Sequence, residues 1–449
     1  MPLADIITIN ITLQTKASSR PGFGTPIVIG ELPAAVVTAG LFTDRAVVLT
    51  PTGFASAMLA LGFTTTDAMY VAVQTAFAQD PSPTSVILGR RVTPTAQISN
   101  VLIATAEAGT YTVTIDGLDI PFVAVAETTT QIRDAMVILI NATAAVVTAA
   151  PGAGDSIDLT ADEAGVSFTL AVDHSATPAN ISSTNPTPNL GIVEDLIAIS
   201  AENDDWYGLV ESTHSDGVNA TAAPYIETQS KIFAAQSNSA DILASGSDDA
   251  FSKLQLAAFA RTMPIYHDDD AEYLDAAWLG DALPTDPGSI TWNMRELTTV
   301  TPSVGVSGGV TATELVNLNN KNANYYERIA GRNVSRHGRM ADGTFVDLIR
   351  GRDWLEINLA LDVFDLLANE DKVPFTDGGA NQVAGVVLAR MHLAADQGIV
   401  IRDTINVDVP LVANVPVVDR ANRNLPDVNF DATLQGAIHT LDISGTLAV

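Results

Sequence analysis

Residues 419–445 read DRANRNLPDVNFDATLQGAIHTLDISG. Downstream of Pro426 this stretch becomes extended in character, because apolar residues recur there close to every second position. Ala432, Leu434, Gly436 and Ile438 occupy alternate positions, and Leu441, Ile443 and, just beyond the stretch, Leu447 follow at less regular spacing. A period near two is typical of a β-strand with one apolar face. We therefore expect residues 434–447 to form a terminal arm that can pair as a strand.

The start of the sequence carries the same pattern. Residues 7–14 read ITINITLQ, in which Ile7, Ile9, Ile11 and Leu13 alternate with polar residues. A turn-rich stretch, residues 19–26, follows, so no hairpin partner lies directly behind this strand. A strand on such an arm can complete the sheet of another copy as readily as its own. Residues 1–26 are thus expected to be an N-terminal arm and linker.

Between the two arms the pattern changes to alternating helices and short strands. Residues 27–94 together with 189–320 have this character, which favours a sheet covered by helices. Residues 321–449 contain two predicted long helices, at about 352–369 and 381–398, and form a C-terminal domain that ends in the arm. The predicted fold class is mixed α/β (α+β), spread over several domains.

Residues 95–188 are expected to form a separate β-rich insertion. Residues 111–115 alternate, Asp116 and Gly117 supply a hairpin turn, and residues 120–125 return. A helix is predicted from Thr129 to Ile140, capped by Thr128 or Thr129. The exit at 182–189 contains two prolines and indicates a linker. The Thr- and Ala-rich tips suggest a protrusion facing solvent.

Composition limits the possible functions. A chain of 449 residues is too long for one ordinary core, so two to four domains are expected. The net charge of −30 disfavours a nucleic-acid partner, which requires a basic surface. It could also reflect a high-salt environment, where screening relieves self-repulsion. Half of the 22 bases lie between residues 328 and 423, so the C-terminal part is comparatively basic.

Targeting and redox signals are weak in this sequence. It has no cysteine, which excludes disulfide and thiol chemistry. Residues 1–5 lack the basic start of a signal peptide, and no apolar run is long enough to span a membrane. We therefore expect no membrane insertion.

Three local motifs suggest chemistry, but none has the required context. Gly305–Gly309 matches the G-x-S-x-G pattern of a hydrolase around Ser307, yet two glycines follow the serine where a helix should begin. His267 precedes three aspartates without the spacing of a calcium loop. The run His214–Asp216 contains the residue types of a catalytic triad, but adjacency in sequence does not create triad geometry. No catalytic residue, metal or cofactor is predicted.

Several longer stretches resemble the tail sheath proteins of contractile-tailed, myovirus-type bacteriophages. They are residues 338–351 (GRMADGTFVDLIRG), 353–355, 372–379 (KVPFTDGG) and 419–445, together with 19–26 and 321–333. The matches occur in the right order and span most of the chain outside the insertion. Several long matches in this order make the resemblance specific at the level of the family.

The resemblance implies a structural subunit of the virion, not an enzyme, assembled in the host cytoplasm. Such subunits would form stacked six-fold rings around a tail tube and would contact baseplate and tail terminator proteins. Terminal arms of neighbours would complete one another's sheets, and contraction would drive the tube through the host envelope. The C-terminal region would lie innermost, and Arg390, Arg402, Arg420 and Arg423 would be candidates for contact with the tube or with neighbouring subunits.

Three alternatives remain open on the sequence. The chain could be the sheath of a related contractile device, of the bacteriocin or secretion type. It could be a serine hydrolase that uses Ser307, or an α/β binding protein that does not assemble.

Overall fold

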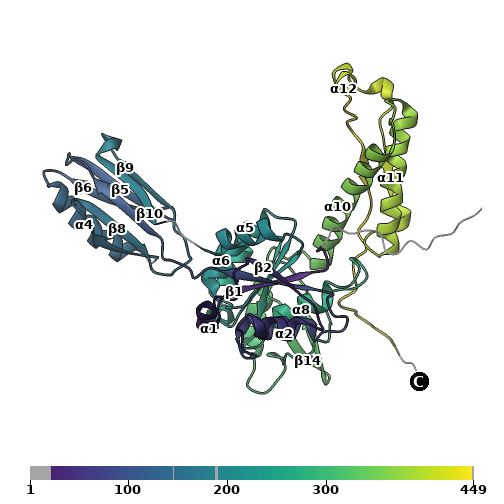
Figure 1. The fold of residues 1–449 in the computed structure, drawn as a ribbon, viewed down its shortest axis with the longest axis horizontal. Helices are drawn as coiled ribbons and strands as arrows, with labels where there is room; N and C mark the ends of the chain where they lie inside the picture. The colour runs from purple at the N-terminus through teal and green to yellow at the C-terminus, as the bar shows by residue number, and fades with distance from the viewer. Residues whose placement is uncertain (1–21, 145, 188–190, 447–449) are drawn as a thin grey trace, which may run out of the picture. The chain divides into compact units, whose positions relative to one another are not determined.

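The computed structural model describes residues 22–144, 146–187 and 191–446, and for 185–187 it describes the backbone only. The predicted strand at Ile7–Leu13 and the last arm residue, Leu447, lie outside the described residues. The chain divides into two compact units, drawn in Figure 1. The smaller unit is built mainly from residues 350–436, and the larger one from residues 24–286, 290–349 and 437–446.

The larger unit is centred on a six-stranded sheet in the order β13-β12-β11-β1-β3-β2. Its strands are β1 (Pro26–Glu31), β2 (Ala46–Leu49), β3 (Val86–Arg91), β11 (Gly208–Glu211), β12 (Ile232–Ser237) and β13 (Thr262–Tyr266). All neighbours are parallel except β2 with β3. Every residue of β12 and β13 is buried, as expected for parallel strands covered on both faces.

Helices cover both faces of this sheet. One face carries α3 (Ala68–Phe77) and α8 (Leu274–Ala282), and the other carries α5 (Ile192–Glu202), α6 (Asp216–Glu227) and α7 (Ala250–Leu256). Shorter helices are α1 (Ala34–Ala39), α2 (Phe54–Ala60) and the 3₁₀ turn Ala240–Leu243. Helix α9 (Ala312–Asn320) begins with Thr311 as its cap. The predicted fold class, mixed α/β over several domains, is confirmed.

A hairpin of β14 (Tyr325–Ile329) and β15 (Arg332–Arg336) was not predicted. It belongs to the larger unit, so the division falls at residue 349/350 and not at the expected 321. The reason is packing. Tyr325 and Tyr326 are buried, the Tyr326 hydroxyl donates to the Leu297 carbonyl oxygen at 2.9 Å, and Asn324 forms a β-bridge with Ile265 at the edge of the central sheet.

Residues 98–187 form two further sheets with a core of their own. One has the order β10-β4-β8-β7 and the other β6-β5-β9. Helix α4 (Thr129–Thr143) buries Ile132, Met136 and Ile140, and Thr128 caps it through a reciprocal capping box, which confirms that prediction. The strands are β4 (Ile98–Ile103), β5 (Gly109–Ile115), β6 (Leu118–Ala124), β7 (Val147–Pro151), β8 (Ser156–Ala161), β9 (Leu170–His174) and β10 (Ile181–Thr187), with a 3₁₀ turn at Pro178–Asn180.

The expected linker at 182–189 was wrong over most of its length. Residues 181–187 are strand β10, which pairs antiparallel with β4. The register breaks between Thr184 and Thr187, so the strand accommodates Pro186, which has no backbone N–H to donate, at an irregularity.

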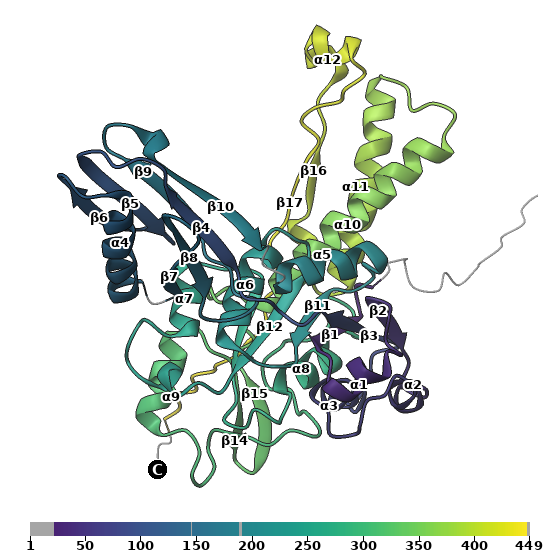
Figure 2. The same cartoon turned by 60° about the vertical axis from the view of Figure 1, so that its left-hand side comes forward.

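The smaller unit is a helical pair with a short hairpin. Helix α10 (Val346–Asn369) and helix α11 (Asp377–Asp396) confirm the two predicted long helices, each starting a few residues early. Thr376 caps α11 by accepting a hydrogen bond from the Gly379 amide. Figure 2 shows β16 (Asn406–Asp408) beside β17 (Asn429–Asp431), and the two strands pair antiparallel. A 3₁₀ turn at Arg402–Thr404 precedes β16, and a 3₁₀ turn at Val412–Asn414 and helix α12 (Val417–Ala421) lie between the two strands. No helix within the described ranges is long and apolar enough to cross a membrane.

Candidate assembly site

The C-terminal arm leaves the smaller unit through a short ladder. The Ile401 amide donates to the Thr433 carbonyl oxygen at 2.8 Å, and the Gln435 amide donates to the Ile399 carbonyl oxygen at 2.9 Å. Val400 and Leu434 form the single β-bridge between these segments. From Gly436 to Thr446 the described chain enters no strand. Beyond Gln435, the arm predicted at 434–447 therefore forms no strand pairing over its described length.

Its apolar side chains face solvent. Leu434 is 45% exposed, Ile438 86%, Leu441 74% and Ile443 86%. Burying one such side chain is worth roughly 1.5–3 kcal/mol, so a row of them in water is an unused source of binding energy. An exposed apolar row beside free backbone N–H and C=O groups is suited to strand addition.

The structure separates the four arginines proposed for tube or inter-subunit contact. Arg390 on α11 is only 6% exposed and holds both Asp362 carboxylate oxygens at 2.6 Å. Its guanidinium also lies 5.1 Å from the centroid of the Trp354 ring. These contacts fall within the smaller unit and favour a role inside the subunit for Arg390.

The other three arginines are exposed. Arg402 pairs with Asp396 at the end of α11. Arg420 and Arg423 lie at and just after the end of α12, and both face solvent. They are the arginines of this set whose side chains remain available to a partner.

His214 is a strongly perturbed titratable group, but it does not form a triad. Its Nδ1 lies 3.0 Å from an Asp270 oxygen and its Nε2 lies 3.4 Å from an Asp275 oxygen. Burial by itself would lower the pKa of His214, but Asp275 and Asp270 outweigh it and raise the pKa to about 10. Ser215 instead caps α6. A histidine that stays charged at neutral pH cannot serve as a general base there.

The other predicted motifs also lack the geometry of a reactive centre. Ser307 is exposed in a turn closed by the bridge between Val304 and Val310, and α9 begins only at Ala312. Buried His267 has its ring nitrogens 3.0 Å from the Asp269 carbonyl oxygen and 2.8 Å from the Thr301 carbonyl oxygen. Across the part of the chain that the structure describes, no group of three or more His, Cys, Asp or Glu residues is arranged to hold a metal.

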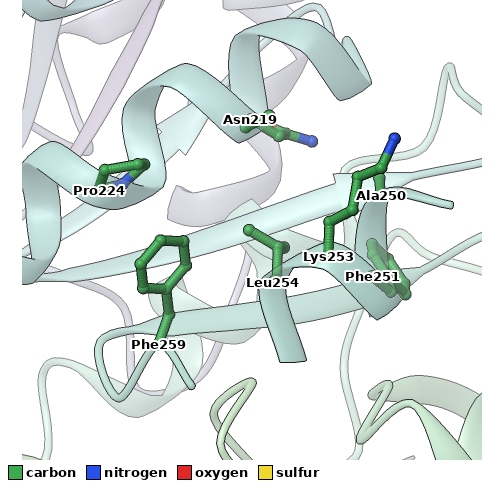
Figure 3. A pocket seen from close by; sticks show the side chains of 8 residues that line it. Asn219, Pro224, Ala250, Phe251, Lys253, Leu254 and Phe259 are labelled. Atoms are coloured by element: carbon green, nitrogen blue, oxygen red, sulfur yellow. The ribbon is translucent and has the colours of Figure 1, made fainter. Parts of the chain in front are cut away.

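A small pocket lies between α6 and α7, as Figure 3 shows. Its volume is about 120 Å³, and its lining is apolar apart from Asn219 and Lys253. The apolar lining residues are Ala220, Pro224, Ala250, Phe251, Leu254 and Phe259. Sites for small-molecule ligands usually measure about 300–1,000 Å³, so this one fits no more than an apolar side chain.

His439, which lies in the arm, belongs to no motif that the sequence reveals. The structure places its Nε2 2.8 Å from the Thr291 hydroxyl and its ring 4.9 Å from the Phe345 ring, edge to face at 86°. Thr291 precedes His439 by 148 residues, so no local pattern could have joined them.

The fold corresponds along almost the whole chain to two solved sheath structures. The helical sheath of the anti-feeding prophage (AFP), in its contracted state, matches with a TM-score of 0.55 over 98% of this chain and 99% of its own, at 11% identity. The sheath complex of PVC, an extracellular contractile injection system, also in the contracted state, matches with a TM-score of 0.57 over 99% of this chain and 98% of its own, at 10% identity. No protein-family description and no curated protein matches the sequence. The chain therefore has the fold of contractile sheath proteins.

Proposed function

We propose that this chain is the sheath subunit of a contractile injection device. It polymerises into a helical sleeve around a tube, and contraction of the sleeve drives the tube through an envelope. The correspondence of fold with two contracted sheaths over nearly the full length of each chain carries this proposal. The unpaired apolar arm supports it independently, because a subunit that worked alone would gain nothing from exposing Ile438, Leu441 and Ile443.

An injection device of the extracellular type is the first candidate, ahead of a phage tail. Both whole-chain correspondences are to sheaths of AFP and PVC, and the latter is described as an extracellular contractile injection system. A phage tail sheath, part of a virion, is the second candidate and rests on the sequence resemblance. Electron micrographs of the source particle would distinguish them. A DNA-filled head on the sheathed tube would establish the phage assignment, and headless particles would overturn it.

In the proposed mechanism the arms link the copies and the folded units move. Residues 434–447 of one copy, and Ile7, Ile9, Ile11 and Leu13 of another, would add strands to a neighbour's sheet. Contacts of this heterologous kind build open helices of stacked rings, for which six-fold symmetry is expected. The free energy for contraction would be stored at assembly, so the subunit needs no catalytic residue and no cofactor.

The remaining partners are proposed on the same basis. Arg420 and Arg423 are the candidates for contact with a tube protein, and baseplate and terminator proteins would meet the ends of the sleeve. The net charge of −30 disfavours direct contact with nucleic acid. Ser307→Ala should leave assembly unchanged, whereas a hydrolase that depends on Ser307 would lose its activity.

The arm is tested by changing its chemistry without changing its length. Ile438→Ser, Leu441→Ser and Ile443→Ser combined should give a folded subunit, with unaltered circular dichroism and melting temperature, that no longer forms tubes in negative-stain images. The matched control is Leu256→Ser, since Leu256 is 87% exposed but lies at the end of α7. Normal tubes from the triple variant would refute the role of the C-terminal arm. Deletion of residues 1–16 tests the N-terminal arm in the same way.

A further inference from the structure

Beyond its ladder with residues 399–401, the described part of the C-terminal arm has one partly buried anchor, His439. From Thr433 to Thr446, His439 is the only residue whose side chain is not exposed. The residues around it, Ile438 and Thr440, face solvent. Whatever fixes the path of this arm along the larger unit must therefore act mainly through the imidazole of His439.

The imidazole lies close to side chains from two segments of the larger unit, one at Thr291 and the other at residues 339–347. The Thr291 hydroxyl accepts a hydrogen bond from the Asn293 amide at 3.3 Å, which leaves its own proton free to be donated to Nε2 of His439 at 2.8 Å. The Phe345 ring packs against the imidazole edge to face. The Arg339 guanidinium lies 5.3 Å from the centroid of the Phe345 ring. The carboxylate of Asp347, at the start of α10, acts electrostatically on the imidazole. A neutral imidazole, which can accept the hydroxyl proton, fits this arrangement.

The charges around the ring oppose its protonation. Burial lowers the pKa of His439, Asp347 acts in the opposite direction, and Arg339 and Arg336 lower the pKa further. His337 faces the same space, and burial together with Arg339, Arg336 and His439 lowers its pKa to about 4. Asp347 does not offset this at low pH, because burial raises its pKa and it loses its charge more readily. A protonated His439 would thus add a third positive charge near Arg336 and Arg339. The carboxylate of Asp347 would compensate for it less as the pH falls.

We propose that Thr291, Phe345 and Asp347 form a socket for the imidazole of His439, which pins the C-terminal arm to the body of its own subunit and releases it when the ring takes up a proton. The socket fixes where the arm leaves the body, so that Ile438, Leu441 and Ile443 are presented to the neighbouring copy. His439 is a positioning residue for assembly. This inference rests on the proposed function for its biological meaning, but the socket itself can be tested without it.

The direction of the pH dependence follows from the lowered pKa. The free imidazole has an ordinary pKa of 6.5, and the docked one has a lower value. Docking is therefore at full strength above pH 6.5, and it weakens as the pH falls below that value, because the undocked arm binds the proton more tightly.

The absence of cysteine allows a spin label to be placed at one position. Asp442→Cys, labelled with a nitroxide, puts the probe three residues beyond the anchor on the full-length subunit. We expect a slow-tumbling label at pH 8 and a several-fold shorter rotational correlation time at pH 5. In His439→Ala the label should tumble rapidly at both pH 8 and pH 5. In Thr291→Val its rotational correlation time at pH 8 should be shorter than in the parent. The control His392→Ala changes an exposed histidine on α11 and should behave as the parent does.

Two results would overturn the socket. One is a label whose mobility is the same in the parent and in His439→Ala at pH 8, and the other is a parent whose label does not respond to pH. The proposed function fails differently. If the label responds as expected but the subunit forms no tubes at any pH and none are seen with its source particle, the socket stands and the sheath assignment falls. If the subunit forms tubes but its label does not respond to pH, the sheath assignment stands and the socket falls.

Discussion

Arg390 joins its helix to α10 through a charge pair with two parallel hydrogen bonds. Its side chain is 7% exposed, and that of Asp362 is 26% exposed. Removing one member of a buried pair leaves the other charge without compensation. Arg390→Met should therefore lower the free energy of unfolding of the smaller unit by about 1–3 kcal/mol, measured as a loss of melting temperature. The control is Arg402→Met, because Arg402 and Asp396 form an exposed pair whose loss should cost at most about 1 kcal/mol. Equal effects of the two substitutions would contradict this assignment.

His214 predicts a pH dependence of opposite sign to that of His439. The pKa of His214 is raised to about 10 in the folded chain, and the ordinary value is 6.5. A raised pKa contributes stability that is complete below pH 6.5 and is lost as the pH rises toward 10. The melting temperature of the parent should therefore exceed that of His214→Gln most at pH 6 and least near pH 10. The comparison cancels other groups that titrate in both proteins. A difference that stays constant across this range would show that the charge of His214 does not stabilise the fold.

At the scale of elements, α3 and α8 pack closely against each other at Gly280. A Cβ atom at Gly280 would lie 2.4 Å from the Ala76 carbonyl oxygen, and that oxygen belongs to a helix backbone that cannot move aside cheaply. Gly280→Ala should therefore destabilise the larger unit by about 1–3 kcal/mol or more, as overpacking does. Gly385 on α11 is the matched control, since a Cβ there meets nothing within 4 Å. Gly385→Ala should be neutral or stabilise by up to about 1 kcal/mol, because alanine favours helix. The melting temperatures of both variants, measured by thermal unfolding, test this prediction. A Gly280→Ala protein as stable as the parent would show that α3 and α8 do not pack this closely.

At the scale of the whole molecule, the excess of acidic residues dominates. The net charge of −30 means that acidic groups repel one another within the folded chain, and that copies of the chain repel one another during assembly. Raising the salt from about 0.1 M to about 1 M shortens the screening distance from about 10 Å to about 3 Å. The melting temperature and the yield of tubes should both rise with sodium chloride. Potassium chloride should act equally if the effect is screening. A melting temperature independent of salt would contradict the view that the composition suits a high-salt environment.

Local patterns in the sequence were sufficient for the fold class and for many elements. The helix cap at Thr128 and the hairpin turn at Asp116 both follow from residues within a few positions of one another. The alternation from Leu434 onward likewise indicated an extended apolar arm. Such features depend on backbone preferences and on the period of side chains along one segment, so the sequence contains them directly.

Tertiary structure alone decided which side chains meet. Asp362 lies 28 residues from Arg390, Asp270 lies 56 from His214, and Thr291 lies 148 from His439. The same holds for the β14–β15 hairpin, whose place in the larger unit depends on the packing of Tyr326 against residues near Leu297. Long-range pairs are set by how whole elements pack, and a periodic pattern specifies the face an element buries but not the element that will cover it. For that reason the sequence determined a sheath-like architecture with an apolar arm, and only the folded chain showed that Arg390 turns inward and that His439 contacts Thr291 and Phe345.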